Sequence, residues 1–593
     1  MTDDETTIGH SAHSRAASPG TTGALAGTAG AAVGLGFGEL MEGAFESIPS
    51  LVVAVSELLS DYTPGDVVRF SIATFGASQK TLLTVGIVVV TLALGGALGR
   101  FAARGRLQVT LAGFALFGLL GGWAAARNPI SPAAGSWVVG LAAAVLAAGA
   151  ALLVVRLASG RAGVAVSEPA ATADATEPDD PVEASSPEAT GRPAVTGTTR
   201  RSFFYAAGAG AAALAMVGLG RSLRGQSAAE QFLETNALRP SPTTEPQAVS
   251  PSTTTTAATT ESQAAPASTT TTVARQPAGP SVQTQLAALD TLDDKVAGIS
   301  SYVTPNDGFY RIDTAFGRVP QVDPGDWRLR FTGMVDNPYE ITFDEIQAMD
   351  LSDHVITLSC VSNEVGGNLV GNAVWTGIPL SVLLDRAGVQ PGADQVVGRS
   401  VDDWTAGFPT DVVYDGRNAI LAIGMNDEFL PTRHGFPARL VVAGLYGYVS
   451  AVKWIEEINL TTWEGFDGYW VPRGWSKEGP MKTQSRIDVP SGGRGLVAGQ
   501  PTPIAGIAWA PTRGIERVEV NIDDEGWLPC RLGEAVGDES WVQWHREWTP
   551  TAGRHRIRVR ATDGDGFTQS KREVPPAPNG AEGWHTISVN VDT

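Results

Sequence analysis

Two cysteines occur in this chain of 593 residues, and one of them stands where it could do chemistry. Cys360 lies in the stretch TLSCVSNEVGGNLVGNAVWTGIPL, residues 357–380, between an apolar run typical of a strand and a glycine-rich loop. A thiol there could be a small, inert core residue or a soft thiolate ligand for a metal ion. No CxxC or HxxH pattern surrounds it, so the spacing indicates neither a zinc site nor an iron–sulfur cluster. A bridge to Cys530 is the one disulfide that the composition allows, so no disulfide framework is expected.

A second stretch, LPTRHGFPARLVVAGLYGYVSAVKWIEEINL at residues 430–460, gathers an imidazole and several cationic side chains. His434 could pair with Cys360 in nucleophilic catalysis, but nothing beside the cysteine indicates an activated thiol. It could equally be a turn histidine with satisfied hydrogen bonds. Arg439 and Lys453 could be solvated surface charges or donors to an anion, to which Arg offers a forked donor and Lys a point charge.

Four stretches together resemble the sulfite oxidase family of molybdenum enzymes. They are residues 357–380 and 430–460, WVPRGWSKEGPMKTQSRI at 470–487, and GIAWAPTRGIERVEV at 506–520. The most specific is the second, in which HGFPAR is followed at short spacing by a glycine-rich turn and VKW. The resemblance implies that a single molybdopterin with one molybdenum binds here, and that Cys360 supplies a thiolate ligand to the metal.

The same resemblance implies roles for further residues. It implies cofactor contacts by His434, Arg439, Lys453 and Asp402. Asp403 could hold the role of its neighbour Asp402. Arg311 falls where the family has an arginine near the metal, and Trp475 falls where it has a tyrosine close to the metal. We therefore expect Arg311 and Trp475 to line the substrate pocket and to act in catalysis together with the metal ligand.

The loop after the cysteine departs from animal and plant sulfite oxidases, because Asn363, Glu364 and Val365 stand where those enzymes have an arginine. Arg-Ile-Asp at 311–313 likewise replaces the arginine-asparagine-histidine loop at the mouth of their site. A small dianion held by fewer cations would bind more weakly, since each charged hydrogen bond contributes ~1.5–3 kcal/mol. Two activities therefore stay open, both by oxygen-atom transfer: oxidation of sulfite or a related sulfur oxyanion, and reduction of a sulfoxide or N-oxide.

Oxidation is favoured, because the known sulfoxide reductases of this superfamily lack the C-terminal sandwich domain. A non-catalytic binding module on a stalk, with Cys360 in its core, is the alternative to an enzyme. The sequence shows no cytochrome b5-like domain, so we expect a separate cytochrome or quinone-linked partner for the electrons. The resemblance also implies a homodimer through the sandwich. The net charge of −20 gives no electrostatic footprint for nucleic acid.

Two domains are expected to position these residues. The first, at 285–490, mixes strand-like runs with helix-like ones, which indicates an α+β fold with a mixed sheet. Its expected elements are strands at 326–335 and 438–444 and helices at 342–349 and 379–388. The second, at 491–593, alternates Ile557, Val559 and Ala561 with arginines, the period-2 pattern of a half-buried strand. Similar runs at 514–523 and 585–591 predict an immunoglobulin-like β-sandwich, of the type that forms dimers in this family.

Apolar runs near the ~18–20 residues that cross a bilayer fill much of the first 220 residues. We expect spans at 24–45, 81–98, 107–127, 135–157 and 202–220, with a membrane-edge helix near 48–59. Glu39, within the first span, could be functional or interfacial. The expected domains are a membrane domain of about four helices at 1–160, a cytoplasmic linker at 161–198, a fifth helix at 199–222, a Thr/Pro/Ala-rich stalk at 223–284, and the two domains above. The fold class is thus multi-domain: an α-helical transmembrane bundle, an α+β molybdopterin domain and an immunoglobulin-like sandwich.

Basic residues indicate how the spans are oriented. Arg100, Arg104 and Arg106 lie between two spans, and further arginines lie between 156 and 201, so both regions should be cytoplasmic. Five spans then export everything after residue 220, although Arg221 and Arg224 run against the rule. Paired arginines in TTRRSFFYAAGAG, 198–210, resemble a twin-arginine export signal or are ordinary flanking charges. We expect a multi-pass protein of the cell membrane with an extracytoplasmic catalytic region.

Overall fold

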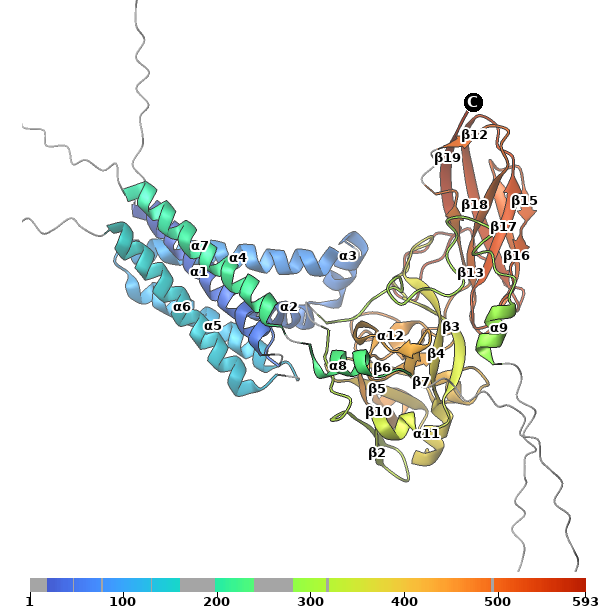
Figure 1. The fold of residues 1–593 in the computed structure, drawn as a ribbon, viewed down its shortest axis with the longest axis horizontal. Helices are drawn as coiled ribbons and strands as arrows, with labels where there is room; N and C mark the ends of the chain where they lie inside the picture. Colours follow the sequence, from blue (N-terminus) through green and yellow to red (C-terminus); the bar gives the residue numbers. More distant parts are fainter. Residues whose placement is uncertain are drawn as a thin grey trace, which may run out of the picture. The chain divides into compact units, whose positions relative to one another are not determined.

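The computed structural model describes residues 19–45, 47–75, 78–129, 131–159, 198–224, 226–238, 281–315, 319–491 and 495–593 (Figure 1). The chain forms two compact units, one of residues 1–225 with 315–318 and one of residues 226–314 with 319–593. The first unit is helical, and the second contains the described strands. Nearly all of the linker expected at 161–198 lies outside the described residues.

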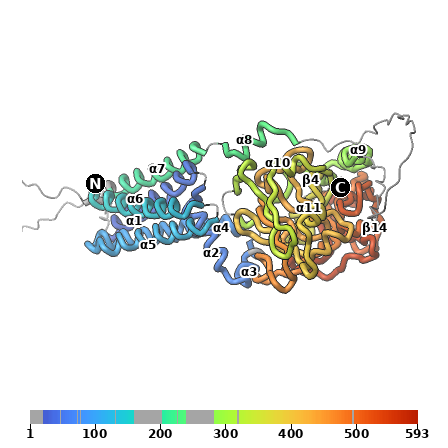
Figure 2. Tube along the Cα trace, turned by 90° about the horizontal axis from the view of Figure 1, so that it is seen from below, coloured from blue at the N-terminus to red at the C-terminus, as the bar shows by residue number. Residues whose placement is uncertain are grey.

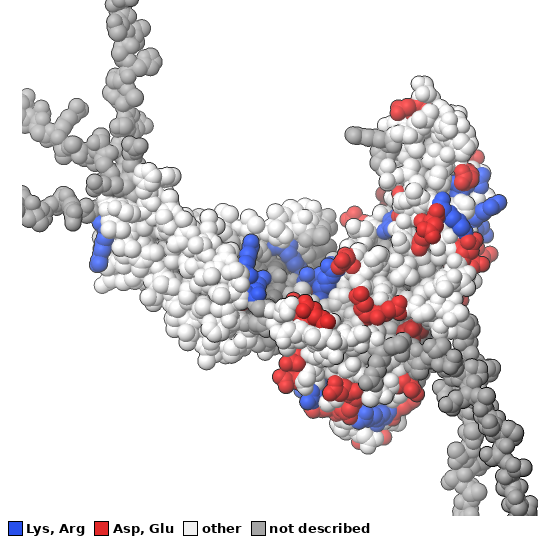
Figure 3. All heavy atoms as spheres, viewed as in Figure 1, with Lys and Arg blue, Asp and Glu red and all other residues white. Residues whose placement is uncertain are grey.

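The first unit is built from helices that follow one another closely. They are α1 (Pro19–Ala44), α2 (Leu51–Tyr62), α3 (Gly65–Phe75), α4 (Gln79–Ala103), α5 (Leu107–Ala126), α6 (Ala133–Ser159) and α7 (Thr198–Leu223). Of these, α1, α4, α5, α6 and α7 are long and apolar enough to cross a membrane, which confirms the five expected spans as candidates. The face seen in Figure 3 shows almost no charged side chains along these helices. α2 falls where the membrane-edge helix was expected.

Small residues allow α1 to pack closely against α7, which lies beside it in both views (Figures 1 and 2). A Cβ atom added to Gly36 would lie 2.7 Å from the carbonyl oxygen of Ala213, and one added to Gly43 would lie 1.9 Å from that of Gly220. From the first contact to the second, the residue number rises by the same amount on both helices, so α1 and α7 run in the same direction. Such approach between backbones is characteristic of membrane helices that pack through small residues.

α1 runs antiparallel to α4 and α6. Gly23 meets the backbone of Gly99, whereas Gly27 meets that of Gly95. The partner's residue number in α4 therefore decreases as the residue number in α1 increases. The glycines of α1 that face α6 show the same inversion. The beginnings of α1 and α7 and the ends of α4 and α6 therefore lie at one end of the bundle. That end carries Arg100, Arg104 and Arg156, the arginines used above to orient the chain.

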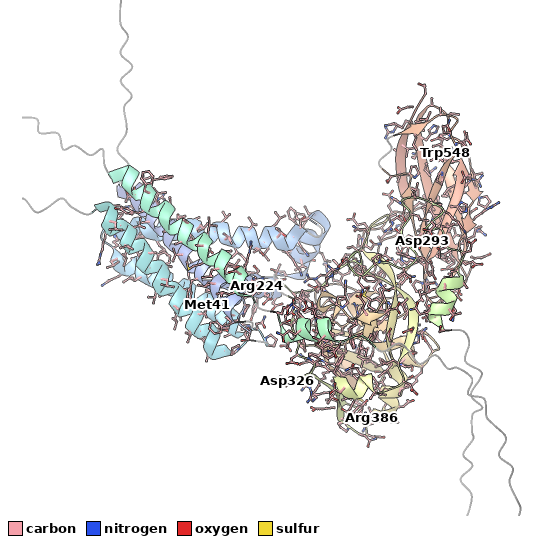
Figure 4. The ribbon with its side chains drawn as sticks, in the orientation of Figure 1. Met41, Arg224, Asp293, Asp326, Arg386 and Trp548 are labelled. Carbon is pink, nitrogen blue, oxygen red and sulfur yellow. The ribbon has the colours of Figure 1, made fainter. Side chains whose placement is uncertain are left out.

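The opposite end of α1 holds two glutamates with partners. Glu42, which is almost fully buried, accepts a hydrogen bond of 3.1 Å from Arg224, just beyond the end of α7 (Figure 4). Glu39 accepts a 2.5 Å hydrogen bond from Ser50, whose hydroxyl also caps the start of α2. Arg224, which runs against the charge bias, is therefore compensated by a carboxylate on the neighbouring helix.

Two sheets form the first part of the second unit. One has the order β2-β1-β10-β5-β6, with β1 (Arg328–Gly333) and β10 (Ile455–Thr461) parallel and β2 (Tyr339–Thr342), β5 (Gln395–Ser400) and β6 (Thr405–Pro409) antiparallel to their neighbours. The other joins β3 (Ser352–Ser359), β4 (Val370–Pro379), β7 (Ala419–Met425) and β8 (Glu428–Phe429), with β9 (Arg439–Val442) also paired to β7. With α10 (Phe343–Gln347) and α11 (Leu380–Ala387), the expected mixed α+β fold and its four quoted elements are confirmed.

Two further sheets face each other in the C-terminal part. One contains β11 (Gln484–Val489), β13 (Thr502–Trp509), β16 (Arg531–Leu532) and β17 (Val542–Trp548); the other contains β12 (Leu496–Val497), β14 (Ile515–Ile522), β15 (Trp527–Pro529), β18 (Gly553–Asp563) and β19 (Thr586–Asp592). Ile557, Val559 and Ala561 are fully buried between them, which confirms the alternation predicted for β18. The sheets give a sandwich; its immunoglobulin-like class stays a prediction.

The sandwich is joined to the preceding domain through residues near α9 (Val282–Ala288). The carboxylate of Asp293 accepts hydrogen bonds from the backbone of Tyr302 at 2.9 Å and from the side chain of Gln543 on β17 at 2.6 Å (Figure 4). The indole of Trp541, close to Gln543 in the chain, donates to the carbonyl of Tyr302 at 2.9 Å. The two parts therefore share a polar seam, which is exposed at Asp293 and buried at Trp541.

The described ends of the segment 223–284 differ from the extended stalk expected there. Residues 228–235 form α8 (Ala228–Thr235), and residues 282–288 form α9. The cause is local: Ser227 and Glu230 make a capping box, and the start of the segment carries apolar side chains that pack against the second unit. The Thr-rich core of the segment, 239–280, lies outside the described residues.

Candidate functional site

Cys360 follows the last residue of β3 and begins the loop to β4. Its backbone N–H donates to Leu369 across the loop at 2.9 Å, and the side-chain oxygen of Asn363 accepts from the N–H of Leu369 at 2.8 Å. Asn363, one of the three residues that stand in place of the family's arginine-bearing stretch, thus closes the loop. The thiol is buried and receives the N–H of Ser362 at 3.4 Å. Burial raises the pKa of Cys360, so the free thiol is protonated and unreactive as a nucleophile.

His434 and Arg439 are brought together by a short helical turn (Thr432–His434) and the start of β9. The Nε2 of His434 donates to the carbonyl of Asn306 at 3.0 Å, because a carbonyl can only accept. Burial, followed by the charge of Arg439, lowers the pKa of His434 to about 3, so the ring is neutral. Nη1 of Arg439 donates to the carbonyl of His434 at 3.0 Å, and its guanidinium lies 4.9 Å from the ring centre of Trp375.

Lys453 and Arg311 meet at a shared carboxylate. Oδ2 of Asp313, which is 6% exposed, accepts from Nζ of Lys453 at 2.8 Å and from Nε of Arg311 at 2.7 Å. Burial lowers the pKa of Lys453 to about 8, although Asp313 acts in the opposite direction. Asp313 thus joins the predicted cofactor lysine to the predicted substrate arginine.

The structure separates Asp402 from its alternative, Asp403. Burial raises the pKa of Asp402, the hydrogen bond from the backbone N–H of Trp404 at 3.3 Å lowers it, and Asp313 and Lys453 act on it in opposite directions. Asp403 instead pairs with Arg399 at 3.1 Å and is largely exposed. Asp402 is therefore the acid that faces the Lys453 cluster.

Two tyrosines not predicted from the sequence stand near Cys360. Burial raises the pKa of Tyr310; a charge on Cys360 acts in the same direction and Arg439 in the opposite one. Burial also raises the pKa of Tyr446 to about 12, a hydrogen bond from the backbone of Lys482 lowers it, and Cys360 again raises it. The sequence could have indicated both residues, because Tyr310 directly precedes Arg311 and Tyr446 lies within the stretch 430–460.

Trp475 lies in a separate aromatic group rather than in the Lys453 cluster. Its ring packs 5.9 Å from that of Tyr448 and 6.4 Å from that of Trp470. Its indole N–H is buried without a partner in the described part of the chain, so it is available to a ligand. The role of Trp475 in a substrate pocket stays a prediction.

The C-terminal sandwich supports the loop that carries the cysteine. A Cβ atom added to Gly366, which has a φ of +77°, would lie 2.2 Å from the ring of His585. The guanidinium of Arg486 donates to the carbonyl of Gly367 at 2.9 Å, and the ring of His585 accepts from the backbone of Ile487 at 2.9 Å. The cysteine loop is therefore packed between the two parts of the second unit.

These surroundings fit an anionic cofactor. Arg439 and Lys453 are both nearly buried, yet among the described residues only Lys453 has a carboxylate partner. A buried guanidinium without a counter-charge is costly to maintain unless an anion compensates it. A phosphate would supply that charge, and the neutral His434 beside it could contact a ring system. The set thus matches the contacts that the family resemblance assigns to molybdopterin.

Comparisons with known proteins agree with this assignment. The family model described as oxidoreductase molybdopterin binding domain matches residues 316–470. The uncharacterized oxidoreductase YuiH of Bacillus subtilis (strain 168) is 31% identical over 192 residues, which cover 31% of this chain and 92% of that protein. Sulfite oxidase of Arabidopsis thaliana is 28% identical over 304 residues, 42% of this chain and 72% of that protein.

The mitochondrial sulfite oxidase of Macaca fascicularis is 26% identical over 346 residues; the match covers 49% of this chain and spans 62% of the length of that enzyme. Among solved structures, the sulfane dehydrogenase SoxCD from Paracoccus pantotrophus has a TM-score of 0.43 and 22% identity, covering 54% of this chain and 95% of that chain. The family model and the relatives matched by sequence support the enzyme hypothesis over the binding module. The chain belongs to the sulfite oxidase family of molybdopterin-binding oxidoreductases.

Proposed function

We propose that the protein is a membrane-anchored, extracytoplasmic molybdenum enzyme that oxidises a small sulfur oxyanion such as sulfite. The observation that carries this proposal is a buried Cys360 thiol and a buried Arg439 guanidinium that both act on the pKa of Tyr310, with no carboxylate partner for Arg439 among the described residues. A metal-binding thiolate and an anion-binding guanidinium in one buried region are what an anionic metal cofactor needs.

One molybdenum on one molybdopterin supplies two-electron oxygen-atom transfer when the cofactor is bound. The chain's own residues have simpler tasks. Cys360 gives up its proton to become a ligand, which its burial disfavours until a cation lies beside it. Arg439 and Lys453 would hold the anionic phosphate, His434 would contact the cofactor through Nδ1 as an acceptor, because its Nε2–H donates to Asn306, and Asp402 would bind it from the Lys453 side.

Arg311 is the residue proposed to attract the substrate anion. Its side chain is 38% exposed, and its Nε and Nη2 donate to Asp313 at 2.7 and 3.4 Å, which leaves Nη1 to meet an anion. Oxidation of sulfite consumes one water and yields sulfate, two electrons and two protons, so a separate cytochrome or quinone-linked partner has to accept the electrons. Trp475 is proposed to line the same pocket with its free indole N–H.

Reduction of a sulfoxide or N-oxide is the second candidate. It is favoured by the loop after Cys360, where Asn363 closes the turn and contributes no cation. A neutral substrate would need fewer cations than a dianion. Part of the charge of Arg311 is already compensated by Asp313, which also suits a neutral substrate.

The membrane location rests on five candidate spans whose directions alternate. Because Arg100, Arg104 and Arg156 lie at the same end of the bundle, the positive-inside bias puts that end in the cytoplasm and residues after α7 outside. Export by a twin-arginine signal at 198–210 and a homodimer through the sandwich belong to the same proposal. Protease added to intact cells should cleave the second unit, and resistance of that unit until the cells are lysed would contradict the orientation.

Paired assays of the full chain in membranes distinguish the two activities. Sulfite-dependent reduction of ferricyanide should be found in the wild type and lost in Cys360→Ser. Oxidation of a reduced viologen driven by a methyl sulfoxide, with no sulfite activity, would favour the reductase. Neither activity in protein that contains molybdenum would show that the substrate belongs to another class.

A further inference from the structure

Residues 226–238, which we call the strap, directly follow the last candidate span. Its helix α8 begins with a capping box, in which Ser227 and Glu230 bond to each other's backbone N–H. The hydroxyl of Ser227 also donates to the side chain of Gln321 at 2.7 Å, and Ala229 is only 1% exposed. The strap is therefore an ordered element of the second unit.

The strap inserts one large side chain into that unit. The ring of Phe232 lies 5.6 Å from that of Phe343 at the start of α10, 5.4 Å from that of Phe429 on β8, and 5.6 Å from that of Phe436. Phe436 is fully buried and stands between His434 and Arg439 in the chain. Phe232 thus packs against the segment that presents the proposed cofactor contacts.

The two flanks of the Thr-rich tract 239–280 reach the same hairpin of the second unit. A Cβ atom added to Gly424 would lie 2.4 Å from a methyl carbon of Leu238, at the near end of the tract. Beyond its far end, the amide of Gln283 donates to Asp427 at 2.5 Å. Gly424 and Asp427 belong to the turn region between β7 and β8. The tract therefore leaves and rejoins the unit at neighbouring points.

Only a few residues connect α7 with the strap. From Leu223 to Ser227 the chain can extend over roughly 14 Å, at ~3.5 Å per residue. This covalent limit holds whatever the orientation of the two units. The tract 239–280 lies after the strap, so it does not add to this distance.

We propose that the strap, and not the Thr-rich tract, fastens the catalytic unit to the membrane anchor, and that Phe232 is a positioning residue for the cofactor-binding segment 434–439. The positioning role of Phe232 rests on the proposed function, because it takes His434 and Arg439 to hold the cofactor. The physical link is the ring contact from the half-buried Phe232 to the fully buried Phe436, which stands between His434 and Arg439 in the chain and helps to fix the backbone of that segment.

Substitutions at Phe232 in the full chain, purified from membranes in detergent, test the proposal. Phe232→Ala opens a cavity beneath Phe436, Phe232→Leu restores much of the apolar volume, and Phe567→Ala, at a 57% exposed phenylalanine of the sandwich, is the matched control. Molybdenum per chain in the trypsin-resistant fraction is the main readout, with the KM for sulfite as the second. Phe232→Ala should hold roughly tenfold less molybdenum, as expected for a lost supporting contact, whereas Phe232→Leu and Phe567→Ala should stay near the wild type.

Full molybdenum content and unchanged KM in Phe232→Ala would overturn the positioning role. A further variant replaces 239–280 by about twelve Gly/Ser residues, a flexible segment long enough to join neighbouring points; its trypsin resistance and molybdenum content should be unchanged, and loss of either would overturn the strap as the fastening element. A wild type without molybdenum would contradict the proposed function instead. The strap would then be judged by trypsin alone, which must cleave Phe232→Ala faster than Phe567→Ala.

Discussion

The electrostatics of the site depend most on Arg439, because its guanidinium is buried and its described partners are two backbone carbonyls, those of His434 and Leu440, and one indole ring. Lys453 differs, since Asp313 compensates it within the protein. The cofactor's phosphate should therefore contribute more to the stability of the protein through Arg439 than through Lys453. Without an anion, Arg439 is a source of instability.

Replacing Arg439 by Met tests this difference. The variant removes a charged donor that contributes ~1.5–3 kcal/mol to binding, so cofactor retention should fall about 10–100-fold. The cofactor-free protein, in contrast, should be no less stable than wild type, since a buried charge is gone. Arg386→Met is the control, because that guanidinium also lies over an aromatic ring, 4.1 Å from Tyr339, but on the exposed surface of α11. Equal retention in both variants, measured as molybdenum after dialysis, would argue against the anion site.

His434 predicts how stability changes with pH. Its pKa is lowered to about 3 in the folded state, from 6.5, mainly by burial. The unfolded chain therefore takes up a proton below pH 6.5 that the folded protein does not bind, so the free energy of unfolding falls as pH drops from 6.5 toward 3. The slope approaches ~1.4 kcal/mol per pH unit for this one group.

Urea unfolding between pH 5 and 6.5 measures that slope. His434→Gln should flatten it. His555→Gln should steepen it, because Asp523 and Thr551 raise the pKa of His555 against the effect of burial, and a raised pKa stabilises the fold at low pH and loses that effect as pH rises. Identical slopes in the wild type and His434→Gln would show that the ring is protonated in the folded protein.

At the scale of single residues, the sequence predicted the site residues that lie within one motif. It did not predict contacts between charged residues from distant parts of the chain. His434, Arg439 and Lys453 were predicted from one continuous stretch. Asp313 was noted only as a departure from the family, and nothing local shows that it bridges Arg311 to Lys453. That contact joins segments that are far apart in the sequence.

Among the elements, the loop from β3 to β4 is the one that the sandwich directly supports. Gly366 needs its positive φ and has no room for a side chain beside His585. Gly416 has a comparable φ of +98° with nothing within 4 Å of an added Cβ. Substitutions at Gly366 and Gly416 therefore separate the effect of backbone strain from that of a steric clash.

Gly366→Ala should destabilise the protein more than Gly416→Ala. The control bears only the strain of a left-handed residue, roughly 1–2 kcal/mol, whereas Gly366→Ala must also displace His585 from its bond to Ile487. Molybdenum content should fall in Gly366→Ala alone, because the moved loop begins at Cys360. Chemical unfolding and metal analysis check both points, and equal effects would mean that the sandwich does not support the loop.

Regular elements were predictable because their patterns are local. The alternation in β18 and the apolar runs of α4, α5 and α6 each fix an element within a few residues. The strap was not predictable, because the packing of Phe232 depends on three phenylalanines from distant segments of the chain: Phe343, Phe429 and Phe436. Composition alone assigned it to the stalk.

At the scale of the whole molecule, the helical and catalytic units are held together by different interactions. The first relies on close backbone approach between small residues, and the second on buried strands and a polar site. In the proposal above, the strap joins the two units through a short stretch of chain after Leu223, and an electron partner at the membrane surface would suit such a connection.

Molybdenum content of the full chain is the measurement that tests the central claim most directly. The protein should be purified from membranes of cells that make the cofactor, beside Cys360→Ser, and analysed by mass spectrometry of the metal. We predict about one molybdenum per chain in the wild type, and a loss of at least ~100-fold in activity with an altered metal spectrum in the variant. Folded wild-type protein without molybdenum would contradict the account and return Cys360 to an ordinary place in the core.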